Sequence, residues 1–344
     1  MQILVTSDTT TLSYWLNWRV LVCAIWVLTP MFISSYIIWK YEYSDHSEAK
    51  REKSRHDEAW KPCVQGVHPI WLLAFRVIAF SLLLGVLVAD IVVHGVGLLL
   101  YYTQWTLILV TVYFGFGSLL SIYGCYQHSK MKTMKKELSA HYVRIDAEQG
   151  LYAPLTDRET AYKIGVEENM KPQEQNDCFP TIGFLCHVFH IIFQMSAGAV
   201  MLTDSVYWFI IFPFLTIKDL DMNCLTILTH TLNAIVLLGD TSLNCLRFPW
   251  FRISYFLFWT SIYVIFQWII HACTSLWWPY PFLDLSGPHA PLWYLLVALL
   301  HIPCYGVFGL IVDLKHWVLP RWFPETCYNV WDKIQPPASE NQKF

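Results

Sequence analysis

Seven apolar runs, each near 20 residues long, constrain the fold of this 344-residue chain more than any other feature. A helix rises about 1.5 Å per residue, so about 20 residues cross the roughly 30 Å hydrocarbon core of a bilayer. Soluble helices rarely run this long with so little charge. We therefore expect membrane-spanning helices at Val20–Trp39, Ile70–Val92, Thr103–Tyr123, Pro180–Thr203, Met222–Leu243, Phe251–Ala272 and Leu292–Val312.

The composition agrees with a membrane location. Hydrophobic residues make up 55% of the chain and charged residues only 14%, against about 25% charged residues in an average soluble domain. A disordered chain is excluded, and an ordinary soluble domain is disfavoured, because too little charge is available to cover its surface. The net charge of −3 gives no argument for nucleic-acid binding. The predicted fold class is all-α, a polytopic transmembrane helical bundle of about seven spans.

The distribution of lysine and arginine predicts the orientation of the bundle. Taking the loops alternately, one set, which includes the N-terminus, carries only Arg19 and Lys218. The opposite set carries 20 of the 23 basic residues, and Arg76 lies within a span. Because basic loops stay in the cytosol, we expect a lumenal or extracellular N-terminus and a cytosolic C-terminus.

We expect three regions along the chain. Residues 1–69 form an N-terminal span and a basic cytosolic loop, residues 70–313 form a six-span membrane core, and residues 314–344 form a cytosolic tail. The charged stretch 126–179 lacks sustained apolar periodicity, and we interpret it as a flexible cytosolic linker within the core. Arg76 lies near the cytosolic end of its span, where its side chain is expected to snorkel to the interface.

Polar side chains within the spans are candidates for a site, because a polar group in hydrocarbon is costly. The predicted topology gathers several of them in the non-cytosolic half of the bundle: Asp90, Thr106, Asp204, Thr226, His230, Asn233, His271 and His301. Two stripes share helical faces, namely Thr226, His230, Asn233 and Asp240 on one span and Thr106, Tyr113 and Gly117 on another. Interhelical packing with satisfied hydrogen bonds would explain such stripes.

A catalytic reading competes with this packing role. A threonine hydroxyl becomes nucleophilic beside a base, and neutral histidine is a suitable base at neutral pH. Thr106 and His230 both lie in the non-cytosolic half, each on a polar face. Paired histidines could instead ligate haem, and three could bind zinc. No H-x-x-x-H or H-E-x-x-H spacing supports zinc, and we expect no metal or other cofactor.

Four stretches resemble a known family: YYTQWTLILVTVYF (101–114), HTLNAIVLLGDTSLN (230–244), FPWFRISYFLFWTSIYVIFQWIIHA (248–272) and WWPYPFLDLS (277–286). They are similar to the plant branch of rolling-stone-like multi-pass membrane proteins. That branch is distantly similar to the androgen-induced FAR-17a-like family of membrane threonine hydrolases, which cleave fatty acid esters of hydroxy fatty acids. The family core has six spans, so the span at Val20–Trp39 would be an N-terminal addition.

The resemblance implies a catalytic pair. The family's threonine, in a Y-L-T-type motif, matches Thr106 in QWT, and its histidine loosely matches His230 in HTLN. Asp90, Asn233 and His301 form a candidate supporting polar cluster by their depth in the bundle. The implied activity is hydrolysis of a lipid ester.

The alternative is a non-enzymatic multi-pass membrane protein, either a scaffold, a fusion-related protein or a transporter. In both cases the expected partner is the lipid bilayer, with a lipid ester as substrate in the first. Plasma membrane and endoplasmic reticulum are both compatible with the sequence, which shows no N-x-S/T sequon and no retention signal.

Overall fold

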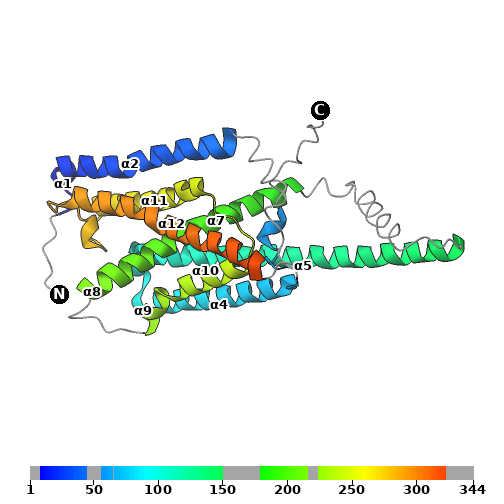
Figure 1. The fold of residues 1–344 in the computed structure, drawn as a ribbon. Coiled ribbons are helices and arrows are strands. Elements are labelled where there is room, and N and C mark those ends of the chain that lie inside the picture. The colour runs from blue at the N-terminus through cyan, green and yellow to red at the C-terminus, as the bar shows by residue number, and fades with distance from the viewer. Residues whose placement is uncertain (1–7, 45–55, 65, 150–178, 216–223, 323–344) are drawn as a thin grey trace, which may run out of the picture.

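A computed structural model describes residues 8–44, 56–64, 66–149, 179–215 and 224–322. Long helices lie roughly side by side and form one bundle (Figure 1). At one end of the bundle α5 begins and α4 and α11 finish; we call this the Tyr102 end. At the opposite end α4 and α11 begin, near Arg252, and we call this the Arg252 end.

Six helices are long and apolar enough to cross a membrane, which confirms a multi-pass, all-α bundle. They are α2 (Trp18–Ile38), α4 (Pro69–His94), α5 (Tyr102–Gln149), α7 (Phe179–Val206), α11 (Ile253–Cys273) and α12 (Ala290–Trp322). Each contains one of the predicted apolar runs or most of it. Shorter elements connect them: α1 (Leu12–Trp15), η1 (Trp39–Ser44), η2 (His56–Ala59), η3 (Val96–Leu100), η4 (Tyr207–Ile211), α8 (Phe212–Leu215), η5 (Trp250–Arg252) and η6 (Pro281–Leu283).

The seventh apolar run, predicted at Met222–Leu243, is not one continuous helix. It consists of α9 (Cys224–Thr229) and α10 (Leu232–Leu243), which are interrupted at His230 and Thr231. The two pieces lie along α4 (Figure 1). At the break, Thr231 has backbone angles of φ −137° and ψ −39°, outside the helical region. Non-helical backbone within a membrane protein is tolerated where protein or a polar cavity surrounds it, so the interruption points to a polar environment.

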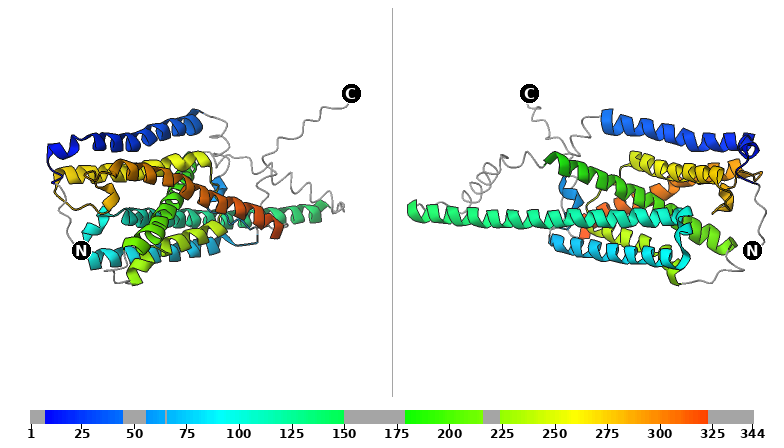
Figure 2. Two further views of the ribbon diagram at one scale, coloured as in Figure 1. Left: turned by 60° about the vertical axis from the view of Figure 1, so that its left-hand side comes forward. Right: turned by 180° about the vertical axis from the view of Figure 1, so that it is seen from behind.

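Helix α5 continues well beyond its membrane crossing. It runs to Gln149 and projects past the other helices at the Arg252 end (Figures 1 and 2). The expectation of a flexible linker from residue 126 is therefore wrong for residues 126–149, which are helical; residues 150–178 lie outside the described residues. Likewise, α12 extends through Trp322, nine residues into the predicted tail, and the remainder of that tail is outside the described residues.

The first span packs onto the rest of the bundle at both ends. Near the Tyr102 end, the Tyr14 hydroxyl donates a hydrogen bond of 2.8 Å to Asp284, and Arg19 donates one of 2.7 Å to the Ser286 carbonyl. Near the opposite end, Glu42 forms a 2.9 Å ion pair with the buried Arg252. Helix α2 lies against α11 and α12 between these contacts, so the predicted N-terminal addition forms one wall of the bundle.

Gly198 lets α7 approach α11 closely. A Cβ atom at this position would lie 2.5 Å from Cδ1 of Phe256, a side chain with no exposed surface. We expect Gly198→Ala to lower the free energy of unfolding by about 1–3 kcal/mol through overpacking. Gly85→Ala is the matched control, because its Cβ would meet nothing within 4 Å, and alanine favours the helix by about 0.5–1 kcal/mol. Thermal unfolding in detergent measures both; equal effects would contradict this packing.

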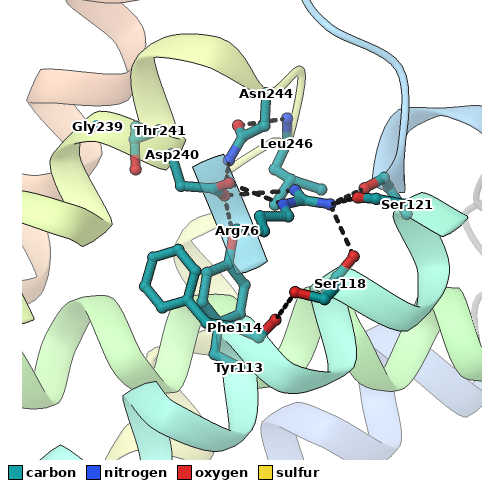
Figure 3. Close-up of polar contacts among 12 residues, drawn as sticks. Arg76, Tyr113, Phe114, Ser118, Ser121, Gly239, Asp240, Thr241, Asn244 and Leu246 are labelled. Carbon is teal, nitrogen blue, oxygen red and sulfur yellow. Dashed lines mark hydrogen bonds and ion pairs between the residues drawn. The ribbon is translucent and has the colours of Figure 1, made fainter. Parts of the chain in front are cut away.

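Arg76 does not snorkel to the interface as expected. Its side chain is fully buried, and its Nε atom donates a 2.8 Å hydrogen bond to Oδ1 of Asp240 on α10 (Figure 3). Its Nη1 atom donates to the Ala59 carbonyl and the Ser121 hydroxyl, both at 2.8 Å. Tyr113 also donates its hydroxyl hydrogen to Asp240. The prediction failed because the sequence does not show that Asp240 faces α4.

These contacts join α4, α5, α10 and the segment around Ala59 at the Arg252 end. Asn244 contributes a further hydrogen bond of 2.8 Å to Asp240 (Figure 3). Every charged atom of the ion pair therefore has partners, which is the condition under which a buried pair is tolerated. The cluster accounts for three members of the predicted stripes as structural hydrogen-bonding groups: the side chains of Tyr113 and Asp240 and the carbonyl of Gly117.

Candidate active site

Thr106 is fully buried and His230 half-buried in the same half of the bundle. The Thr106 hydroxyl donates to the Tyr102 carbonyl at 3.1 Å and lies 3.0 Å from the Thr203 hydroxyl on α7. The His230 ring stacks on Tyr207, with 3.5 Å between ring centroids. Among the interactions of the described residues, none joins Thr106 to His230. The predicted nucleophile, Thr106, and the predicted base, His230, thus contact different residues.

The three candidate supporting residues are also separated. Asp90 accepts hydrogen bonds from His94 and Gln104 near the Tyr102 end. Asn233 is fully buried on α10, next to the break in the seventh crossing. His301 lies on α12 and contacts α11. The sequence predicted a similar depth in the bundle for all three residues. In the structure each of them contacts different residues, so they do not form one cluster.

His301 is hydrogen bonded to a threonine that the sequence analysis did not single out. Its Nε2 atom lies 2.9 Å from the hydroxyl oxygen of Thr260 on α11. Its Nδ1 atom lies 2.7 Å from the Val297 carbonyl oxygen, one turn earlier on α12. A carbonyl only accepts hydrogen bonds, so Nδ1 carries the proton and Nε2 is free to accept. The Phe256 carbonyl, at 3.3 Å, and Nε2 of His301, at 2.9 Å, are both acceptors within reach of the Thr260 hydroxyl hydrogen. The hydroxyl can therefore donate to a histidine whose tautomer and orientation are fixed.

Tyr102 adds a third polar group to this pair. Its hydroxyl lies 2.9 Å from the Thr260 hydroxyl oxygen. When Thr260 donates to His301, Tyr102 is the donor to Thr260. Hydroxyl, imidazole and phenol thus converge from α11, α12 and α5, with a nucleophile beside a base and the base held by a third group.

Thr260 lies on the wall shared by two cavities. One, with an empty volume of about 470 Å³, lies next to α2 and is lined by Trp26, Val27, Pro30 and His301 among others. The other, of about 570 Å³, is lined by Tyr102, Thr203, Tyr207 and His230 among others. Val264, Phe282, Leu283 and Val297 also line both. Thr260 therefore borders both cavities.

The sequence contained a signal for Thr260. Thr260, Gln267 and His271 recur at i, i+7 and i+11 on α11 and so share one helical face. Gln267 and His271 are fully buried on this face. This third polar stripe resembles the stripes that contain Thr106 and His230. Only the structure shows that its Thr260 faces His301.

A function for this chain has to be argued from the positions and chemistry of these side chains, because no related protein was found. No protein-family model, no curated protein and no solved structure matches the chain.

Proposed function

We propose that this membrane protein hydrolyses lipid esters, with Thr260 as nucleophile and His301 as base. The 2.9 Å contact between the Thr260 hydroxyl and Nε2 of His301, on the wall between two cavities, is the observation that carries the proposal. The geometry of nucleophile, base and orienting carbonyl is the arrangement that acyl transfer requires. The family resemblance independently favours a threonine–histidine hydrolase.

The reaction would proceed in two steps. The Thr260 oxygen attacks the ester carbonyl while His301 accepts the hydroxyl proton at Nε2. The proton then passes to the departing alcohol, which leaves an acyl–threonine ester. A water molecule, deprotonated by His301, releases the fatty acid and restores Thr260. Tyr102 is placed to donate a hydrogen bond to the negative charge that develops on the carbonyl oxygen.

The two cavities suggest how a lipid ester would lie. The α2-side cavity is lined largely by apolar and aromatic side chains, including Trp26, Val27 and Leu257, and suits an acyl chain. The second cavity also presents mostly apolar surface, and the hydroxyls of Thr103 and Thr203 on its lining are bonded to Tyr280 and Thr106. The imidazole of His230 lies on the lining of this cavity, toward which the alcohol part would extend. Apolar burial would hold the chain and polar contacts would orient the ester.

The proposed orientation follows the basic loops, with the N-terminus lumenal or extracellular and the C-terminus in the cytosol. Thr260 and His301 are the eighth and twelfth residues of their helices, so both lie well within the hydrocarbon core. A substrate would enter from the bilayer. Plasma membrane and endoplasmic reticulum are the two proposed locations.

Labelling by a fluorophosphonate probe tests the proposal. We expect the purified full chain to be labelled, and Thr260→Ala to abolish labelling because the nucleophile is removed. Thr260→Ser retains a hydroxyl and should still be labelled. Thr111→Ala is the matched control, since Thr111 is a buried threonine bonded only to its own helix. Undiminished labelling of Thr260→Ala would reject Thr260 as nucleophile.

The same experiment decides between Thr260 and the pair expected from the resemblance. Thr106 is one hydroxyl away from the second cavity, through Thr203, and His230 lines that cavity. If Thr106 were the nucleophile, Thr106→Ala would lose labelling and Thr260→Ala would keep it.

A non-enzymatic role, such as a transporter, is the second candidate function. The break between α9 and α10 favours it, because transporters often bind substrates or ions at discontinuous membrane helices. In that case the hydrogen bonds of Thr260 would only join helices. Fluorophosphonate labelling of the wild-type protein and of every variant would then stay at background.

A further inference from the structure

Unpartnered polar atoms gather around the break in the seventh crossing. Five buried side-chain atoms there have no hydrogen-bond partner: both carboxylate oxygens of Asp204, Nδ1 of His230, Oγ1 of Thr231 and Nδ2 of Asn233. Leaving one buried polar group unpaired costs about 1–3 kcal/mol. The Arg76 cluster, at the other end of α10, is by contrast fully paired. Such a concentration indicates a site that a ligand completes.

The contacts of α7 and of η4, which follows it directly, place these atoms in one neighbourhood. Tyr207 stacks on the His230 ring, and the Trp208 indole donates a 3.1 Å hydrogen bond to the His230 carbonyl. Asp204 lies one turn before them on α7 and is close enough to Asn233 for the two side chains to interact. They do not form a hydrogen bond of normal geometry. The carboxylate and the amide therefore lie close to each other, and this contact does not satisfy their hydrogen-bonding capacity.

The orientation of the Asn233 amide limits the chemistry of the ligand. Its Oδ1 atom accepts a 2.8 Å hydrogen bond from the Ala234 backbone N–H, so Nδ2, a donor, is directed away from that contact. Asp204 offers acceptors. An anion would be repelled by Asp204, and a metal ion or ammonium group would find no lone pair on the Asn233 N–H groups. An alcohol hydroxyl both donates to a carboxylate and accepts from an amide, so it satisfies both sides.

We propose that the Asp204–Asn233 pair binds a hydroxyl of a neutral lipid head group, such as the glycerol of a monoacylglycerol. The inference rests on the proposed function, whose substrate class it names. The second cavity reaches from Thr260 to His230, and Asn233 follows His230 by three residues. With the ester at Thr260, the alcohol part extends toward this pair.

Access to the pair requires a local movement, because its unpartnered atoms have almost no exposed surface. His230 and Thr231 stand between two short helices, and their backbone N–H groups donate long hydrogen bonds of 3.3 and 3.4 Å to the Thr226 and Leu228 carbonyls. A shift there would stretch these two bonds. The hydrogen bonds gained by the ligand would offset the loss of the His230–Tyr207 stacking.

Binding of a non-hydrolysable lipid tests this inference separately from catalysis. We would measure binding of tritiated 1-O-hexadecylglycerol to the purified full chain in nanodiscs, with unlabelled competitors. Hexadecyl methyl ether lacks the hydroxyls, hexadecanoate is an anion and hexadecylamine a cation. We expect the glycerol ether to bind at least about tenfold more tightly than each competitor, since a site built for a hydroxyl discriminates against analogues without it.

Variants locate the preference. Asn233→Leu and Asp204→Leu should each reduce the preference for the glycerol ether to about threefold or less. Hexadecyl methyl ether should bind to both variants as it binds to the wild type, which would show that the cavity is intact. Thr241→Val is the control on the same helix, because its hydroxyl is already bonded to the Leu237 carbonyl. Equal binding of the glycerol and methyl ethers, or tighter binding of the amine or the acid, would overturn the inference. Preference for the glycerol ether without fluorophosphonate labelling would instead reject only the hydrolase proposal.

Discussion

Arg76→Met is expected to lower the free energy of unfolding by about 3–5 kcal/mol, because it leaves the Asp240 carboxylate buried without its ion-pair partner. Both side chains have no exposed surface and are 2.8 Å apart. Tyr113 and Asn244 would still donate to Asp240, but two neutral donors replace a guanidinium poorly. Denaturant-induced unfolding in mixed micelles measures the change.

Two further variants show whether the ion pair is the cause. The double variant Arg76→Met/Asp240→Leu removes both charges and should recover much of the lost stability, as apolar replacement of a buried pair often does. Arg321→Met is the control for loss of an arginine, because Arg321 is exposed and stacks only on Trp317. If Arg76→Met were as stable as Arg321→Met, the buried pair would not hold the bundle together.

His301→Gln is expected to reduce kcat/KM for ester hydrolysis by about 10²–10⁴-fold, the usual contribution of a general base. Glutamine can keep a contact with Thr260 but does not take up its proton at neutral pH. The fall should appear mainly in kcat, since the cavity that binds the lipid is preserved. Hydrolysis of a chromogenic long-chain ester in detergent measures both constants.

His271→Gln is the matched control for this experiment. His271 is another fully buried histidine on a membrane helix, bonded to the Gln267 carbonyl at 2.8 Å and stacked on Trp278. It does not line either cavity. Loss of activity equal to that of His301→Gln would mean that the effect comes from disturbed packing rather than from the base.

The fold could be predicted in most respects because the hydrocarbon of a bilayer offers no hydrogen-bonding partners to the backbone. Runs near 20 apolar residues form helices in a bilayer whatever their neighbours, so α2, α4, α5, α7, α11 and α12 were all foreseen. The break at His230 was not, since it depends on a contact of the backbone with Trp208 of η4. The helical extension of α5 also escaped, because its apolar pattern weakens where the helix continues past Tyr126.

The site was predicted only in part, for a different reason. Helical periodicity shows which residues share a face, and it correctly grouped Asn233 with Asp240, both fully buried on α10. It does not show which faces meet. Pairing of Arg76 with Asp240, and of Thr260 with His301, depends on how separate helices are rotated about their axes. Those rotations come from packing across the whole bundle.

The most direct test of the central claim is the identity of the residue that carries the fluorophosphonate adduct. Proteolysis and mass spectrometry of labelled wild-type protein should locate the adduct on Thr260, within the peptide that contains α11. His301→Gln should leave the site of modification unchanged and slow its formation. An adduct on Thr106, or on any residue outside the two cavities, would contradict the assignment of Thr260 and His301 as the catalytic pair.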